Sequence, residues 1–158
     1  MGEIFEHSTG KALNTRIDTT GMLYKYITTS NLYWNRFELG SLRSMYFKDS
    51  ELERYTVKKG DLLVCEGGDI GRSAIWNYDY NICFQNHIHK LRAYFKIHTL
   101  FFYYVIFFYK SVGLIGGKGI GIKGLSSGTL HNICLPLPPL NEQKRITEKI
   151  NTLFNLLE

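Results

Sequence analysis

The sequence contains no hydrophobic run long enough to cross a membrane. Its longest apolar stretch, residues 100–109, is about half the length of a spanning helix, which needs roughly 20 residues, and His98 and Lys110 bracket it. The chain also opens without the basic segment and apolar run of a signal peptide. We therefore expect no membrane contact and a buried helix in this region.

Cysteine is scarce as well. Cys65, Cys83 and Cys134 are widely spaced and odd in number, which argues against a secreted disulfide framework and for a reducing compartment. We expect a cytoplasmic protein. Cys83 lies near His87 and His89, but a closed zinc site needs four ligands and no fourth has a suitable spacing. We therefore expect no metal.

Acidic residues are missing between Asp79 and Glu142, an interval that carries six Lys or Arg residues and four His residues. The formal net charge of the whole chain is +5. Such an uneven field attracts polyanions, and nucleic acid is the commonest polyanion in a cytoplasm. The alternative is a basic surface that serves only solubility.

Sequence templates for catalysis are absent too. The glycine-rich residues 66–72 lie between two predicted strands, so they lack the helix that follows a dinucleotide fingerprint and indicate a β-hairpin turn. The glycine-rich residues 113–129 do not match the phosphate-binding loop template. No nucleophile–base pair, methyl-donor pocket or nuclease metal cluster is recognisable. We expect a chain that performs no bond-making itself.

Short strand candidates outnumber helix candidates. The patterns predict one helix at residues 97–112 and strands at 22–28, 46–47, 55–57, 60–65, 73–76 and 83–92. A chain of 158 residues supports one domain with a core of its own. We predict an α+β fold, with packed helices on a twisted β-sheet.

Several polar stretches are candidates for nucleic-acid contact. On the predicted strand 83–92, alternation places Gln85, His87 and His89 on one face, and Asn86, Lys90 and Arg92 on the other. These side chains suit hydrogen bonds to bases or to neighbouring loops. Residues 30–40 combine aromatic and basic side chains that either stack on a nucleic acid or pack internally. Arg72 is either a salt-bridge partner or a base or phosphate contact.

The glycine-rich segment is the strongest of these candidates. Its glycines allow backbone N–H groups to approach an anion, while Lys118, Lys123, Ser126 and Ser127 add charge and donors. The alternative is a flexible loop without a ligand.

A proline-rich strap introduces the last helix. Prolines at 136, 138 and 139 favour an extended entry, and Asn141 is a suitable N-cap. The following helix carries a narrow apolar stripe of coiled-coil type, formed by Gln143, Ile146, Ile150, Leu153 and Leu157, with Phe154 beside it. The stripe packs either on the chain's own core or on a partner helix. Because the pattern lacks a stop signal at its end, we expect the helix to be cut short.

Four stretches in order resemble the specificity (S) subunits of type I restriction-modification systems. The most distinctive is LPLPPLNEQKRITEKINTLF at residues 135–154, similar to the junction between a target-recognition domain and the spacer helix of that family. The others are residues 60–72, 85–89 and 121–128, and the beginning at residues 2–11 is less distinctive. The resemblance divides the chain into a DNA target-recognition domain, 1–139, and the start of a spacer or dimerisation helix, 140–158.

The resemblance implies that partner subunits carry out all of the chemistry. A full subunit of the family has two recognition domains joined by two long antiparallel helices, reads the halves of a split target in double-stranded DNA, and binds two modification subunits. Adenine methylation with S-adenosylmethionine, and restriction with ATP and Mg, belong to the modification and restriction subunits, so no cofactor is expected in this chain.

With one domain and one helix, the chain resembles a fragment or a half-subunit. It would pair with a second recognition domain or a second copy through Ile146, Ile150, Leu153 and Leu157. The expected DNA contacts are Arg72, Asn86, His87, Lys118, Lys123, Ser126 and Ser127. The alternatives are the recognition part of a fused methyltransferase-endonuclease, and an antirestriction decoy that binds modification subunits without binding DNA.

Overall fold

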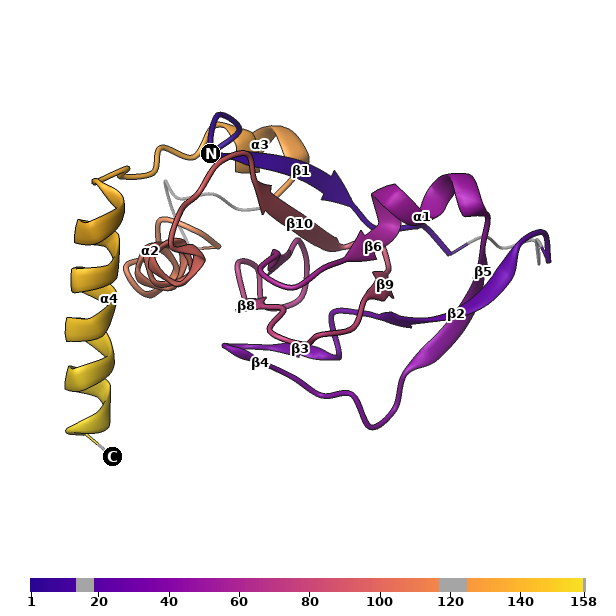
Figure 1. The fold of residues 1–158 in the computed structure, drawn as a ribbon, viewed down its shortest axis with the longest axis horizontal. Helices are drawn as coiled ribbons and strands as arrows, with labels where there is room; N and C mark the ends of the chain where they lie inside the picture. The colour runs from indigo at the N-terminus through magenta and orange to yellow at the C-terminus, as the bar shows by residue number, and fades with distance from the viewer. Residues whose placement is uncertain (14–18, 117–124, 158) are drawn as a thin grey trace.

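The structure is a computed structural model that describes residues 1–13, 19–116 and 125–157. Strands and helices mix along the chain, and the strands form three small sheets (Figure 1). The elements are β1 (Phe5–Thr9), β2 (Met22–Ile27), β3 (Leu32–Tyr33), β4 (Arg36–Phe37), β5 (Arg43–Phe47), α1 (Asp49–Tyr55), β6 (Thr56–Val57), β7 (Leu62–Cys65), β8 (Ser73–Ile75), β9 (Ile82–Phe84), β10 (Ile88–Ala93), α2 (Thr99–Ser111), α3 (Ser127–His131) and α4 (Leu140–Asn155).

The first sheet has the strand order β1-β10-β7-β8, and all its neighbours are antiparallel. Its inner strand β7 is buried along its whole length, as its run of apolar residues requires. Residues 66–72 join β7 to β8 and close a hairpin, so the predicted turn is confirmed. Gly71 in this turn has φ +85°, and a Cβ there would lie 2.8 Å from Ile115 Cγ2. Only glycine fits that position without strain.

The second sheet has the order β5-β2-β9-β6, with β2 parallel to β9. The predicted single strand 83–92 is wrong, because β9 and β10 belong to different sheets. Between them the chain turns at His87, which has φ +70°. The turn is held where Asn86 N donates to Lys11 O (2.9 Å) and Glu66 N donates to His87 O (2.9 Å). The predicted alternation of faces therefore breaks at this turn.

Helix α2 covers the first sheet, and the predicted helix at 97–112 is confirmed in place. Phe102 is fully buried and meets the Phe5 ring edge to face at 5.3 Å. The helix is not buried all round, because Phe108 is largely exposed. Among the described residues, no helix has both the length and the apolar character that a membrane span requires.

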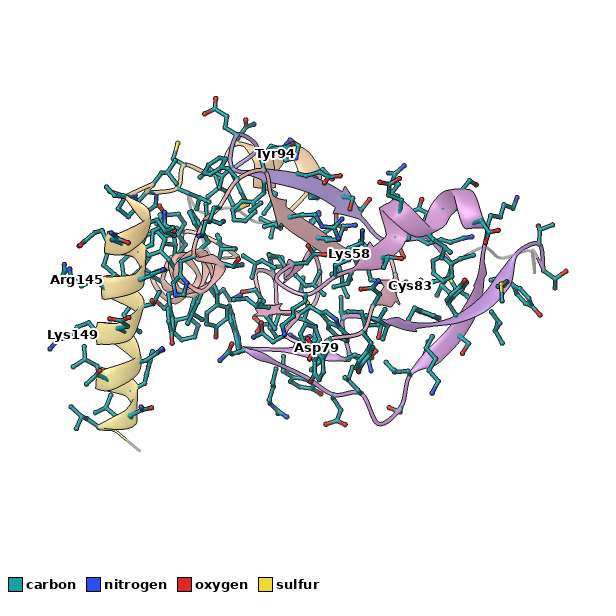
Figure 2. All side chains as sticks on the ribbon, in the orientation of Figure 1. Lys58, Asp79, Cys83, Tyr94, Arg145 and Lys149 are labelled. Carbon is teal, nitrogen blue, oxygen red and sulfur yellow. The ribbon has the colours of Figure 1, made fainter. Side chains whose placement is uncertain are left out.

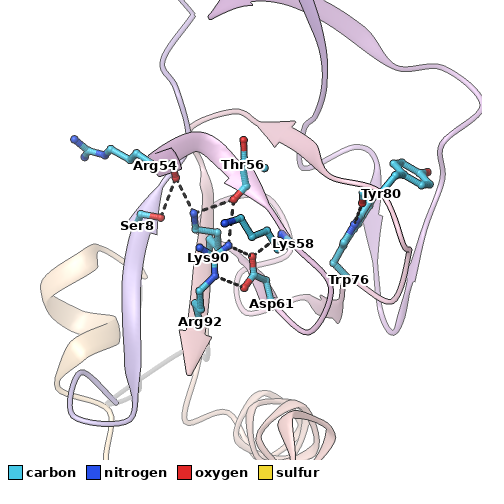
Figure 3. A network of polar contacts seen from close by, with 9 residues as sticks. All are labelled: Ser8, Arg54, Thr56, Lys58, Asp61, Trp76, Tyr80, Lys90 and Arg92. Carbon is cyan, nitrogen blue, oxygen red and sulfur yellow. Dashed lines mark hydrogen bonds and ion pairs between the residues drawn. The ribbon is translucent and has the colours of Figure 1, made fainter. Parts of the chain in front are cut away.

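Charged side chains of β10 join the two sheets (Figure 3). Lys90 is 2% exposed, and its Nζ donates to the carbonyls of Arg54 (2.7 Å) and Thr56 (3.0 Å), which end α1 and begin β6. Two residues on, Arg92 binds the buried carboxylate of Asp61 through Nε (2.8 Å) and Nη2 (2.6 Å). Burial, and then the charge of Arg92, lower the pKa of Lys90 to about 8.

Helix α4 packs along α2, and its first half is fixed by a buried glutamine (Figure 1). Gln143 Nε2 donates to Pro138 O (2.8 Å), and its Oε1 accepts from His98 N (2.9 Å) at the start of α2. The helix begins at Leu140 with Pro139 as N-cap, so the predicted cap at Asn141 is wrong by two residues. Pro139 can serve as the cap because its ψ of 149° is non-helical, while its ring fixes φ at −53°.

The predicted apolar stripe divides between two environments. Ile146 packs against the core around α2, and Ile150 is half-buried. Farther along, Leu153 is 52% and Leu157 is 82% exposed. Figure 2 shows Arg145 and Lys149 projecting from the side of α4 that faces away from α2.

Replacing Lys90 with methionine tests the charge of the buried lysine. The pKa of Lys90 lies below its ordinary value of 10.5, so between pH 8 and 10.5 the unfolded chain binds a proton that the folded chain lacks. The contribution of Lys90 to the free energy of unfolding therefore rises with pH over that window. Urea unfolding at pH 7.5 and 9.5 should show wild type gaining about 1 to 2 kcal/mol relative to Lys90→Met.

Lys59→Met is the matched control, since Lys59 is exposed and pairs with Asp79 at the surface. Because Lys59→Met keeps Lys90, its stability should rise with pH as that of wild type does, so wild type should gain nothing comparable relative to this control. An equal difference between wild type and Lys90→Met at both pH values would contradict a buried ammonium at Lys90.

Candidate nucleic-acid interface

Three connecting segments and the end of α2 meet at one end of the sheets. We call this group the loop cluster and define it as residues 32–37, 66–72, 85–87 and 110–116. Its parts are joined directly, because Asn35 N donates to Ser73 O (3.0 Å) and Lys110 Nζ lies 3.0 Å from Asp69 Oδ1. Loops fixed on a rigid scaffold are where binding residues commonly lie.

The β3–β4 hairpin is anchored to this cluster by Trp34. The Trp34 ring packs edge to face on Phe107 of α2 at 5.2 Å between ring centroids, and its Nε1 donates to Asp69 Oδ2 (3.2 Å). Aromatic edge contacts of this kind add about 0.5 to 1.5 kcal/mol beyond their buried area. The hairpin is therefore held on both α2 and the β7–β8 turn.

Arg72 is part of the internal structure of this cluster. Its Nη2 donates to Thr29 O (2.7 Å), and its guanidinium lies 5.3 Å from the centroid of the Tyr33 ring. Its Nε is buried and has no hydrogen-bond partner in the described ranges. Arg72 thus supports the β3–β4 hairpin from below, and its contact with DNA stays a prediction.

Asn86 and His87 lie at the turn between β9 and β10, next to the end of β7. Cys65 N donates to Arg72 O (2.8 Å), and the next residue, Glu66, bonds the backbone of His87. The three predicted contacts Arg72, Asn86 and His87 are thus brought together. His87 is exposed with Nδ1 3.6 Å from Glu66 Oε2, while Asn86 Oδ1 is buried without a partner among the residues described.

The other predicted contacts are not in this group. Ser126 caps α3, since its Oγ accepts from Thr129 N (3.3 Å), and Ser127 is the exposed first residue of that helix. Figure 1 shows α3 beside β1, on the opposite side of the first sheet from the β3–β4 hairpin. Lys118 and Lys123 lie outside the described residues.

Tyr33 and Arg36 were not chosen from the sequence as site residues, although both lie in the aromatic and basic stretch 30–40. The Arg36 guanidinium lies 4.7 Å from the Tyr33 ring centroid, on the exposed hairpin. The mixed pattern was the available signal, but it does not separate packing residues such as Trp34 from exposed ones.

Three histidines meet beneath β1, an arrangement that sequence spacing did not reveal. His7 Nε2 lies 2.8 Å from His89 Nδ1, and the His7 and His131 rings meet edge to face with centroids 4.9 Å apart. Burial, and then repulsion from the other two imidazoles, lower the pKa of His7 to about 4. Within the described residues, no three His, Cys, Asp or Glu side chains are arranged to hold a metal ion. We interpret the trio as a packing contact between β1, β10 and α3.

Comparison with protein families gives one match over the whole chain. The model of the type I restriction modification DNA specificity domain matches residues 1–158. This finding confirms the resemblance seen at residues 135–154 and in the earlier stretches.

Relatives and solved structures agree with that match. The chain is 36% identical over 112 residues to the type I restriction enzyme EcoBI specificity subunit of Escherichia coli, covering 70% of this chain and 23% of that protein. The HsdS subunit from Thermoanaerobacter tengcongensis superposes with a TM-score of 0.72 at 16% identity, over 98% of this chain and 36% of that one. A chain from a study of complex assembly and conformational transition of the type I R-M system gives 0.71 at 16% identity, over 98% and 37%.

The two structural matches confirm the predicted α+β fold with its C-terminal helix. The chain spans less than a quarter of the Escherichia coli subunit and little more than a third of the matched chains.

The histidine trio makes stability sensitive to acid. Because the pKa of His7 in the folded chain lies below its ordinary value of 6.5, the unfolded chain binds more protons between pH 6.5 and 4, and stability falls as pH falls through that window. His7→Asn removes this titration. Between pH 7 and 4.5 wild type should lose about 1 to 2 kcal/mol more unfolding free energy than His7→Asn.

His87→Asn serves as the control in the same denaturant series, because it removes an exposed imidazole that does not touch the trio. Its loss of stability with falling pH should follow that of wild type. Parallel curves for wild type and His7→Asn would show that the trio is not the source of the acid sensitivity.

Proposed function

The chain belongs to the family of type I restriction modification DNA specificity domains, and on that premise we propose that it recognises one half of a split DNA target for a type I restriction-modification complex. The observation that carries the proposal is the family match over all of residues 1–158. The loop cluster supports it, because exposed polar and basic side chains gather there on a rigid base.

Recognition in this proposal divides into two kinds of contact. Lysines and backbone N–H groups fix the register of the protein on phosphates, and polar side chains read base edges in the major groove. Arg36 and His87 are exposed at the loop cluster and are available to bases, whereas Arg72 braces the hairpin from inside. The interval between Asp79 and Glu142, with no acidic residue, supplies a field that attracts the duplex.

The chain itself makes and breaks no bond in this proposal. Modification subunits would methylate adenine with S-adenosylmethionine, and a restriction subunit would use ATP and Mg²⁺. The role of this chain is to place those subunits at a defined sequence, in the cytoplasm where the DNA lies.

The end of α4 supports a helix partner. Ile146 packs on the chain's own core, so the predicted interface reduces to the distal part of the stripe. There Leu153 in the last turn of α4 and Leu157, two residues past its end at Asn155, are exposed, and the sequence spacing of the stripe is typical of a coiled-coil seam. We propose that this end pairs with the helix of a second recognition domain, supplied by a second copy when only this chain is present.

A binding selection tests the recognition proposal. The chain, alone and with a modification subunit, is mixed with a pool of randomised duplexes at 50 and 200 mM salt. We expect one short motif to be enriched, and about four phosphate contacts would weaken binding roughly 100-fold between the two salt concentrations. Salt-sensitive binding without an enriched motif would show that the chain binds DNA only nonspecifically, through a basic surface. No binding even with the partner would favour a decoy that holds modification subunits.

Sedimentation tests the helix proposal. Wild type should show a concentration-dependent dimer, and the double variant Leu153→Lys, Leu157→Lys should weaken it at least about 10-fold, because each lysine would lie in an apolar seam. Both side chains are exposed in the single chain, so the melting temperature of the monomer should change little. Leu137→Lys, at an equally exposed leucine in the strap, is the control. A wild type that stays monomeric at all concentrations would contradict the seam.

A further inference from the structure

The β3–β4 hairpin is built to hold its shape. At its root, Asn31 is buried, and its side chain accepts from Thr28 N (3.0 Å) and donates to Glu38 O (3.0 Å). The backbones of Asn31 and Glu38 also bond each other at 2.8 Å. The two ends of the hairpin are thus clamped by one side chain, so the segment between them does not depend on a ligand for its order.

The hairpin also has distinct inner and outer side chains. Leu32 is fully buried, and Phe37 packs edge to face on the Trp76 ring at 5.0 Å. Trp34 fixes the tip to α2. Tyr33 and Arg36, opposite each other in the register, are exposed instead. The inner residues pack the hairpin onto the rest of the domain. The outer pair, Tyr33 and Arg36, is not needed for that packing.

The Tyr33 ring contacts two guanidinium groups. That of Arg36 lies 4.7 Å from the ring centroid, and that of Arg72 lies 5.3 Å from it. Arg72 is tied to Thr29 O and faces inward, so it supports the ring. Tyr33 in turn restricts where the Arg36 guanidinium lies, which lowers the entropy cost of a later contact.

Arg36 differs from the five cations that pair with carboxylates in the described part of the chain, and it resembles Arg54, whose guanidinium lies 5.4 Å from the centroid of the Tyr55 ring. Lys11, Lys59, Arg92, Lys110 and Arg145 each form a salt bridge with a carboxylate. Arg36 forms none within residues 1–13, 19–116 and 125–157, where its guanidinium contacts the Tyr33 ring. Its five N–H donors are therefore held in position and left free.

On the basis of the proposed function, we propose that Arg36 reads a guanine in the major groove of the target, with Tyr33 and Arg72 as positioning residues. A two-stranded ribbon enters the major groove, and the planar fork of an arginine matches the O6 and N7 acceptors of guanine. The ring stacking leaves the edge of the fork available for this bidentate contact. Lysine keeps the charge but lacks the fork, so the two residues are distinguishable at such a site.

The test is a selection from randomised duplexes with Arg36→Lys, in the presence of the modification subunit. Wild type should enrich a motif with a guanine at one position, and Arg36→Lys should lose the preference for that guanine by about 10- to 100-fold. The preferences at the other positions should persist, and the salt dependence should stay the same, because the charge is retained. Arg43→Lys, at an exposed arginine of β5 outside the loop cluster, is the control and should select the wild-type motif.

Positioning by Tyr33 has its own readout. Tyr33→Phe keeps a ring beneath Arg36 and should retain the guanine preference, whereas Tyr33→Leu should reduce it about 2- to 5-fold through loss of the cation–π contact. Thermal melting confirms that each variant is folded before selection.

The outcomes separate the two proposals. If wild type enriches no motif, the proposed recognition function fails. If wild type enriches a motif and Arg36→Lys enriches the same one, the function stands and the assignment of Arg36 is overturned. Arg36→Ala is selected in the same way. If it weakens binding equally to every sequence, Arg36 contacts phosphate, which also overturns the assignment of Arg36 to a guanine.

Discussion

The fold depends on the charged side chains of β10, an inner strand of the first sheet, which link that sheet to the second one. Lys90 donates from β10 to the carbonyls of Arg54 in α1 and Thr56 in β6 of the second sheet, and Arg92 Nη2 also reaches Thr56 O (3.4 Å) while it pairs with the buried Asp61 beside β7 of its own sheet. The negative end of a helix dipole favours such a cation. Each buried charge costs free energy unless it is paired, so the partners lock the two sheets in one arrangement. That arrangement positions the end of β7 and the start of β10.

The position of the loop cluster follows from those strand ends. The turn at residues 85–87 leads into β10, the turn at 66–72 leaves β7, and Glu66 joins these two turns. Trp34 and Arg72 fasten the β3–β4 hairpin to the turn at 66–72. A recognition surface made of loops binds more tightly when the loops are already ordered, because binding then loses less conformational entropy. The same design allows residues such as Arg36 to vary without disturbing the sheets, because they contribute little to the packing.

Sequence patterns captured the parts of the fold that local rules determine. The glycine-rich turn at 66–72 and the apolar helix near 97–112 were predictable, because a hairpin turn needs positive φ and a buried helix needs apolar residues. The break at His87 was not, since a positive φ outside glycine has no signal in one sequence. The two-residue strands β3 and β4 are too short to show the alternating pattern of a strand. Thr147 of α4 is buried although it is polar, so an apolar pattern does not reveal it. The predicted contacts Arg72, Asn86 and His87 lie together in the loop cluster, and their binding to DNA stays a prediction, whereas Arg36 was singled out only from the structure.

Hydrogen–deuterium exchange of the chain with and without a duplex that carries its selected motif tests the central claim most directly, because it reports which backbone segments the DNA covers. Our account predicts slower exchange at residues 32–37, 66–72 and 85–87, with little change in α1 and in β5, an edge strand of the second sheet. Protection confined to α1 and β5, with the loop cluster unaffected, would contradict it.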